Sequence, residues 1–330
     1  MQCSYLRVCL IALLSCNILI CSAQSTNIDS IITPASLKAL VQTLSADSFQ
    51  GRLTGSIHAT KAALYISDAF KNAGALPIAG NEGYIMPFVI PDKITAFNVV
   101  AALPGYSKAQ EIVIFSAHYD HIGTQKNTIA NRVPERGSPE KGDDVYNGAN
   151  DNASGVSGLI HLARYFAKET HRERTLIFIA FSGEEEGLLG SKKLAENFDP
   201  KAVIAMINMD MIGRPLSRNR KNPMITGSEW SNLQQLLNKK LFEQAPQYGK
   251  NYFRSDNFPD ERLYSRSDNY PFAQRGITAH SIMTNSPYDP YYHSLNDEWE
   301  TLDYPFMAKV VKAIALATTG LVDGSITPEK

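Results

Sequence analysis

The chain has 330 residues, enough for one large domain or two small ones. It carries 32 Lys and Arg against 33 Asp and Glu, which gives a formal net charge of −1. This balance excludes the basic field typical of nucleic-acid-binding domains and any general attraction to an anionic membrane. We therefore expect no nucleic-acid partner.

Residues 1–23 have the pattern of a secretory signal peptide. Arg7 precedes an apolar stretch over 8–20, and small residues suit cleavage between Ala23 and Gln24. The stretch is short and interrupted by polar residues, so it is a poor membrane span. We expect export to the periplasm or the extracellular space, with no span in the mature chain.

All four cysteines lie in this leader, at Cys3, Cys9, Cys16 and Cys21. The segment ending at Cys16 resembles a lipobox, but the apolar residues 18–20 argue against a lipoprotein anchor. Residues 24–330 therefore have no disulfide and no thiolate ligand. Any zinc there must be bound by histidine and carboxylate, a ligand set that suits a catalytic site.

Residues 24–330 alternate helical and strand patterns. Helices are expected within 36–74, over 156–167 with Ser154 as N-cap, over 228–242 and over 306–321. Near-continuous apolar runs suit strands buried on both faces. These runs are Ala96–Leu103, Glu111–Ala117, Thr175–Phe181, Ala202–Met209 and Ile277–Met283.

This alternation predicts one α/β domain, with a mixed, mostly parallel central sheet flanked by helices on both faces. Residues 124–146 are polar and rich in Gly, Pro and charge, so we expect a surface loop there. His161 is expected on a solvated helical face.

Histidines and carboxylates follow the second, third and fourth of these runs. They are His118 and Asp120, then Glu184 and Glu185, then Asp210. Ligands of open α/β sheets bind beyond the carboxyl ends of the strands. Carboxylates gathered there repel one another unless a cation is bound, so the pattern predicts a metal site, for two ions.

Two further segments supply the remaining candidates. Asp151 lies between Gly148 and Gly155, which would let the backbone turn sharply and approach a metal closely, and His293 lies in a Tyr-His-Ser segment. For His121 we expect a pocket-lining or hydrogen-bonding role rather than metal ligation.

Taken together, these segments resemble family twenty-eight of the metallopeptidases, the secreted co-catalytic zinc aminopeptidases. The resemblance implies a zinc-aminopeptidase-like (phosphorylase/hydrolase-like) fold for the exopeptidase domain 24–330, and peptide substrates with a free N-terminus. The matching segments are Gly51–Ser56, Ala117–Gly123, Asn147–Gly155, Gly183–Ser191, Asn208–Gly213, Ser267-Asp268 and His293–Asp297.

The resemblance also implies two zinc ions and their ligands. His118 and Asp210 would hold one ion, Glu185 and His293 the other, and Asp151 would bridge the two. Three carboxylates and a bridging hydroxide would balance the four charges of two zinc ions.

The same resemblance implies the catalytic roles. Glu184 would be the general base: it would take a proton from a water between the two metals and so produce the bridging hydroxide. Asp120 would orient His118 through the second ring nitrogen of that histidine. The peptide between Asp151 and Asn152 would be cis.

Other functions stay open at this point. A single-zinc glutaminyl-peptide cyclotransferase would keep Asp151, Glu185 and His293 but have little use for a full second site. A dipeptidase or carboxypeptidase of the same fold, or a non-catalytic binding domain, would also fit parts of the pattern. The preferred N-terminal residue and the oligomeric state are not predicted.

Overall fold

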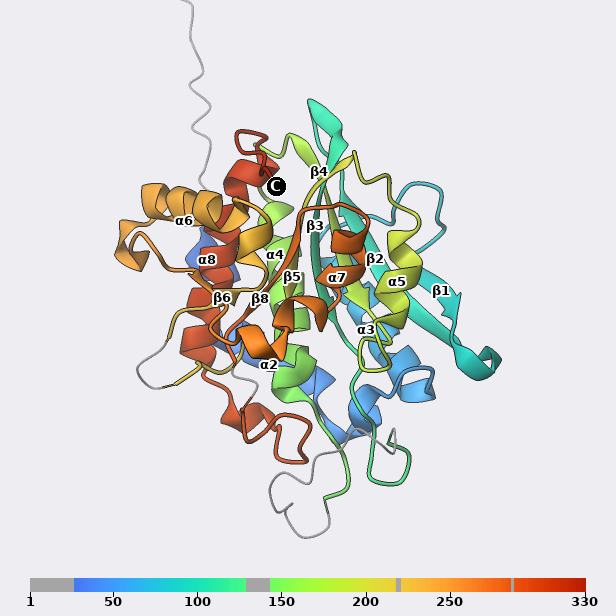
Figure 1. The fold of residues 1–330 in the computed structure, drawn as a ribbon. Helices are drawn as coiled ribbons and strands as arrows, with labels where there is room; N and C mark the ends of the chain where they lie inside the picture. Colours follow the sequence, from blue (N-terminus) through green and yellow to red (C-terminus); the bar gives the residue numbers. More distant parts are fainter. Residues whose placement is uncertain (1–26, 129–142, 218–220, 286–287) are drawn as a thin grey trace, which may run out of the picture.

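The computed structural model describes residues 27–128, 143–217, 221–285 and 288–330. The predicted signal peptide, 1–23, lies outside these ranges. The described strands form one eight-stranded sheet in the order β1-β2-β4-β3-β5-β8-β6-β7 (Figure 1). Their bounds are β1 Ile85–Val89, β2 Thr95–Leu103, β3 Lys108–His118, β4 Arg174–Phe181, β5 Val203–Met209, β6 Met224–Ile225, β7 Arg254–Ser255 and β8 Ala279–Met283.

The sheet is mixed, as predicted. Its central strands β4, β3, β5 and β8 pair in parallel, while β2 is antiparallel to both β1 and β4, and β6 is antiparallel to β8. Successive side chains of the central strands point to opposite faces, and both faces are covered. Phe115 and Phe178 stack on one face, and Ile114 and Ile177 are buried on the other.

Helices cover the two faces unequally (Figure 1). The face that carries Phe115 packs against α3, α4 and α8, with α2 packed on α4 and α8 and α6 packed on α8, and the face that carries Ile114 packs against α5 and α7. The helix bounds are α1 Ile28–Ile31, α2 Pro34–Leu44, α3 Ile57–Asn72, α4 Gly155–Phe166, α5 Leu189–Ala195, α6 Leu233–Gln244, α7 Asn269–Gln274 and α8 Tyr304–Val322.

The closing helix α8 begins where the Asp303 side chain accepts the backbone N–H of Phe306, with a proline in the first turn. Among the described residues, α8 alone is long and apolar enough to cross a membrane. Most of its side chains are buried against the sheet and α6, as in the core helix of a globular domain.

The helices expected within 36–74 are α2 and α3, and a turn over Asp47–Arg52 separates them; three consecutive residues of this turn have positive φ. The prediction for His161 was wrong. His161 is fully buried, because α2 packs over α4; its ring nitrogens contact the Ser157 carbonyl and the Ser36 hydroxyl.

Candidate metal centre

The predicted ligands gather at the carboxyl ends of three neighbouring strands. His118 is the last residue of β3, Asp210 directly follows β5, and Glu184 and Glu185 follow β4. Because β4, β3 and β5 are adjacent and parallel, their ends meet at one edge of the sheet. The apolar strand runs thus place the charged residues side by side.

Asp151 reaches this edge from a tight loop that precedes α4. Gly148 has a φ of +56°, and a Cβ added there would lie 2.3 Å from the Asp151 carbonyl oxygen, so the loop requires glycine. The Asp151–Asn152 peptide is cis, as the resemblance implies. Ser154 does not cap α4 as predicted; its hydroxyl donates to the Asn150 carbonyl and accepts the Ile212 N–H.

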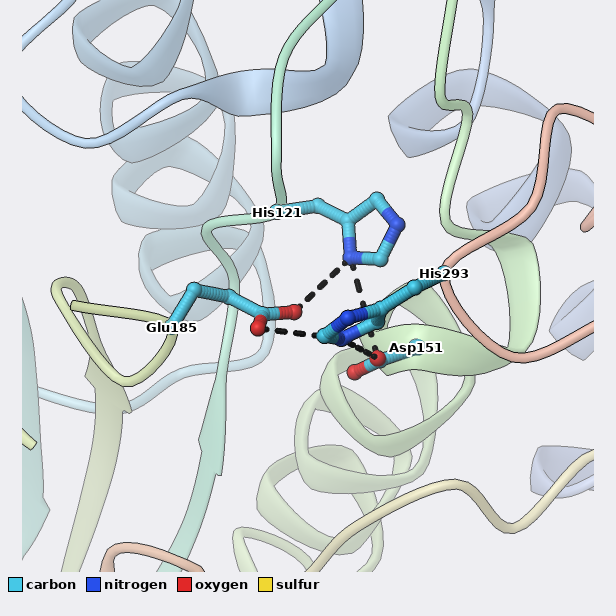
Figure 2. A group of neighbouring side chains, drawn as sticks. All are labelled: His121, Asp151, Glu185 and His293. Atoms are coloured by element: carbon cyan, nitrogen blue, oxygen red, sulfur yellow. Dashed lines mark hydrogen bonds and ion pairs between the residues drawn. The ribbon is translucent and has the colours of Figure 1, made fainter. Parts of the chain in front are cut away.

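The donor atoms form two groups. In the first, nitrogens of His121 and His293 and oxygens of Asp151 and Glu185 all lie within 4.8 Å of one another. Figure 2 shows these four side chains converging from different loops. In the second group, donor atoms of His118, Glu184 and Asp210 lie within the same distance of one another.

Asp151 lies between the two groups. Its Oδ1 is 3.3 Å from His118 Nε2, and its Oδ2 is 3.2 Å from His293 Nε2. Each oxygen of one carboxylate therefore faces a different histidine. Within the second group, His118 Nε2 is 3.7 Å from Asp210 Oδ1. Within the first group, His293 Nε2 is 3.1 Å from Glu185 Oε2.

The chemistry of this donor set fits bound zinc. Burial alone would lower the pKa of His293, but the Glu185 and Asp151 carboxylates raise it to about 11. Burial also opposes a charged His118, yet Glu184, Asp151 and Asp210 raise its pKa well above the ordinary value. These buried carboxylates thus require positive charge among them, which zinc ions would supply in place of protons.

His121 is fully buried beside Glu185. Its Nδ1 lies 3.0 Å from Glu185 Oε1 and 3.8 Å from Asp151 Oδ2. The first distance is that of a hydrogen bond, the role predicted for His121. A histidine that holds a carboxylate ligand in this way fixes the ligand's orientation.

Glu184 is partly exposed where it borders the donor atoms. Desolvation raises the pKa of its carboxyl group well above the ordinary value; the neighbouring carboxylates Glu185 and Asp210 add to this, while His118 opposes it. A carboxyl group with a raised pKa can accept a proton near neutral pH and return it.

Asp120 makes contacts that differ in part from the predicted ones. His118 Nδ1 lies 3.2 Å from the backbone carbonyl of Asp120 and 3.8 Å from its carboxylate, so the main chain makes the closer contact. The carboxylate accepts the Thr54 hydroxyl and the backbone N–H groups of Glu184 and Glu185. Asp120 therefore joins the loop after β3 to the loop after β4.

Arg52 lies buried beneath the site and donates only to backbone carbonyls. Its guanidinium reaches Leu44, Tyr119, Asn147 and Gly148 at 2.6–2.9 Å. Burial lowers the pKa of Arg52 to about 10, although Asp151, Asp120 and other carboxylates of the site raise it. One cation thus ties the loop after β3 to the loop that carries Asp151, and faces the negative charge of both.

Asp297 holds the other side of the Asp151 loop. Its carboxylate accepts the backbone N–H groups of Asn150 and Asp151 at 3.0–3.1 Å and pairs with Arg214 at 2.9 Å. The residue-by-residue predictions missed Arg52, Arg214 and Asp297. Arg52 and Asp297 do lie in segments that carried the resemblance, which was the available signal.

Two connected hollows open on the donor atoms. The inner pocket, about 50 Å³, is lined by Met211, Leu263, Met283, Ser267 and Asn285 together with the donor side chains. The outer groove, about 570 Å³, is lined by Gly187, Leu188, Lys192 and Ser265. Glu184, Arg266 and Tyr292 border both. A larger hollow of about 920 Å³ along α6 contains none of the donor residues.

Known proteins resemble the chain in sequence and structure. The model of peptidase family M28 matches residues 98–318. A probable zinc metalloprotease of Pyrenophora tritici-repentis is 24% identical over 92% of this chain and 75% of its own. A probable leucine aminopeptidase of Arthroderma otae is 29% identical over 66% of this chain and 55% of its own. Two further probable zinc metalloproteases are matched over 54% and 38% of their lengths.

Solved structures share the fold. A zinc aminopeptidase from Bacillus subtilis superposes with a TM-score of 0.67 at 16% identity, over 89% of this chain and 96% of that one. Porphyromonas gingivalis glutaminyl cyclase gives a TM-score of 0.67 at 18% identity, over 88% and 99% of the two chains.

Proposed function

This chain belongs to peptidase family M28 and is a zinc-dependent peptidase, and we propose that it is an aminopeptidase that removes N-terminal residues with two zinc ions. The observation that carries the proposal is the position of the Asp151 carboxylate: one oxygen lies 3.3 Å from His118 and the other lies 3.2 Å from His293. One ion would be held by His118 and Asp210, the other by Glu185 and His293, with Asp151 between them.

When bound, the zinc ions supply Lewis acidity to the scissile carbonyl and acidity to the attacking water. Glu184 borders both hollows, so its carboxylate accepts the proton of the attacking water and delivers it to the leaving amine. Its raised pKa suits both steps.

The substrate is oriented by the shapes and charges of the two hollows. The small inner pocket takes the N-terminal side chain against Met211 and Met283, and the carboxylates of Asp151 and Asp210 attract the free ammonium group. The rest of the peptide leaves along the outer groove. This arrangement favours cleavage after the first residue over carboxypeptidase action.

A substrate panel tests the proposal. Leucyl amide and leucyl peptides should be hydrolysed, their N-acetylated forms should not, and a chelator should abolish turnover, which zinc restores. A peptide with N-terminal glutamine distinguishes an aminopeptidase from a glutaminyl cyclase. An aminopeptidase would release free glutamine, whereas a cyclotransferase would release ammonia and leave the peptide chain intact. Cleavage of blocked peptides would contradict the aminopeptidase proposal.

The Glu184→Gln variant tests the base. Glutamine keeps the size of the side chain but cannot take a proton, so we expect kcat to fall by about 10²–10⁴-fold or more. Zinc content should stay at the wild-type level, as measured by elemental analysis. Glu186→Gln, one residue beyond the ligand Glu185, is the matched control. Wild-type turnover in Glu184→Gln would remove Glu184 from the mechanism.

We also propose that the enzyme acts after export. The pattern of residues 1–23 supports this. N-terminal sequencing of the protein recovered outside the cytoplasm should begin at Gln24. A start at Met1 would contradict cleavage.

A further inference from the structure

Arg266 lies at the junction between the inner pocket and the outer groove. Its side chain is 44% exposed and makes two long contacts: Nη1 is 3.5 Å from Glu261 Oε2, and Nη2 is 3.5 Å from the Tyr292 hydroxyl. Such long contacts leave most of its five N–H donors free for a ligand. The guanidinium thus faces the path that a peptide takes out of the site.

Lys192, in the last turn of α5, lines the same outer groove and is exposed. It has no ion pair among the described residues, whereas the adjacent Lys193 is bound to Glu196 at 2.7 Å. The outer groove is therefore lined by two cations, Arg266 and Lys192, as well as by the carboxylates Glu184 and Glu185.

The distance to Arg266 suits a short peptide. The Tyr292 ring stacks on the His293 ring with centroids 3.9 Å apart, and its hydroxyl meets the Arg266 guanidinium at 3.5 Å. Arg266 thus lies at most about 10 Å from the His293 ring, the reach of about three extended residues. A carboxylate one to three residues beyond the scissile bond falls within this range.

We propose that Arg266 and Lys192 form a subsite for a substrate carboxylate on the leaving-group side of the scissile bond. The proposal rests on the aminopeptidase function and adds a substrate class: peptides of two to four residues with a free C-terminus, or longer ones with an acidic residue just after the bond. An arginine fork binds a carboxylate through two N–H groups, and the lysine adds charge across the groove. A substrate carboxylate competes with Glu261 for Arg266.

The test compares free acids with C-terminal amides. We expect kcat/KM for Leu-Ala and Leu-Ala-Ala to exceed that for their amides by about three- to tenfold, the size expected for partly exposed ion pairs. The ratio should shrink in high salt. Leu-Asp-Ala-amide against Leu-Asn-Ala-amide asks whether a side-chain carboxylate can occupy the subsite instead of the C-terminal one.

Variants assign the preference to residues. Arg266→Gln and Lys192→Gln should each lower the acid-to-amide ratio, and the double variant should bring it to about one. Arg266→Lys, which keeps the charge but loses the fork, should keep part of it. Lys193→Gln, one residue from Lys192 but paired with Glu196, should leave the ratio unchanged and is the matched control.

The outcomes separate the subsite from the function. Equal kcat/KM for acids and amides in the wild type, with both hydrolysed, overturns the subsite and leaves the aminopeptidase standing. An undiminished ratio in the double variant overturns it as well. A wild-type enzyme that hydrolyses neither form overturns the proposed function and the subsite with it.

Discussion

Two groups of carboxylates lie on either side of the same short loop. At the Asp151 end, three carboxylates alternate with histidines. At the Asn147 end, a hollow is lined by acidic side chains without histidine, and only the Asn147 amide links Asp47 to Glu298. The acidic residues of this second group, which we term the acidic hollow, are Asp47, Asp143, Asp144, Glu298 and Glu300.

The two groups relieve their repulsion differently. In the metal centre, His118 and His293 carry raised pKa values, and they hold the pKa of Asp151 well below its ordinary range despite its burial. In the acidic hollow, burial and then the neighbouring carboxylates raise the pKa of Glu298 to about 7, so a bound proton on Glu298 relieves the repulsion. The metal centre therefore differs from the acidic hollow by its histidine nitrogens and by the buried cation Arg52 beside it, and not by its number of carboxylates alone.

Replacing Arg52, the buried cation beside the metal centre, should have the largest effect on stability and on zinc affinity. Arg52→Met leaves four carbonyls without their donor and the site's carboxylates without their buried cation, so we expect the free energy of unfolding to fall by roughly 3–5 kcal/mol. Zinc affinity should fall with it. Urea unfolding of the metal-free protein and chelator competition measure the two effects.

A matched control separates fold from site. Arg172 also donates to backbone carbonyls, of Pro104 and Phe166, away from the metal centre. Arg172→Met should therefore destabilise the fold and leave zinc affinity unchanged. If Arg52→Met bound zinc as tightly as the wild type, Arg52 would be support for the fold alone.

The His121→Gln variant tests whether His121 orients Glu185 or binds zinc itself. If His121 only holds Glu185, the variant keeps two zinc ions but releases the one at Glu185 and His293 about 10–100-fold more readily. Chelator-release kinetics measure this, with His161→Gln, another buried histidine, as control. A drop to one zinc per chain would show instead that His121 is a ligand.

Glu298→Gln tests the second group. The folded protein holds a proton on Glu298 up to about pH 7, whereas an unfolded glutamate loses it near pH 4.5, so this residue makes stability fall as the pH rises through that window. Glutamine removes the charge, and we expect the melting temperature to rise by roughly 2–4 °C at pH 8.

The gain from Glu298→Gln should close as the pH falls toward 5, which melting curves at both pH values will measure. Glu300→Gln, in the same hollow but exposed, should change little. An equal gain at pH 5 and pH 8 would contradict the raised pKa.

The sequence was sufficient where a signal is local. Apolar runs followed by His118, Glu185 or Asp210 predicted the strands, and the carboxyl ends of these strands bring the candidate ligands together. It was insufficient where a role depends on distant packing. Nothing near His161 shows that α2 will cover it, and nothing near Arg52 shows that carbonyls 67 to 96 residues later will surround its guanidinium.

The central claim is that one aspartate serves two zinc ions, and zinc stoichiometry of the Asp151→Asn variant tests it most directly. Elemental analysis should give two zinc ions per wild-type chain, two for the exposed-site control Asp199→Asn, and close to none for Asp151→Asn. One zinc ion in the wild type, or one retained by Asp151→Asn, would contradict the claim.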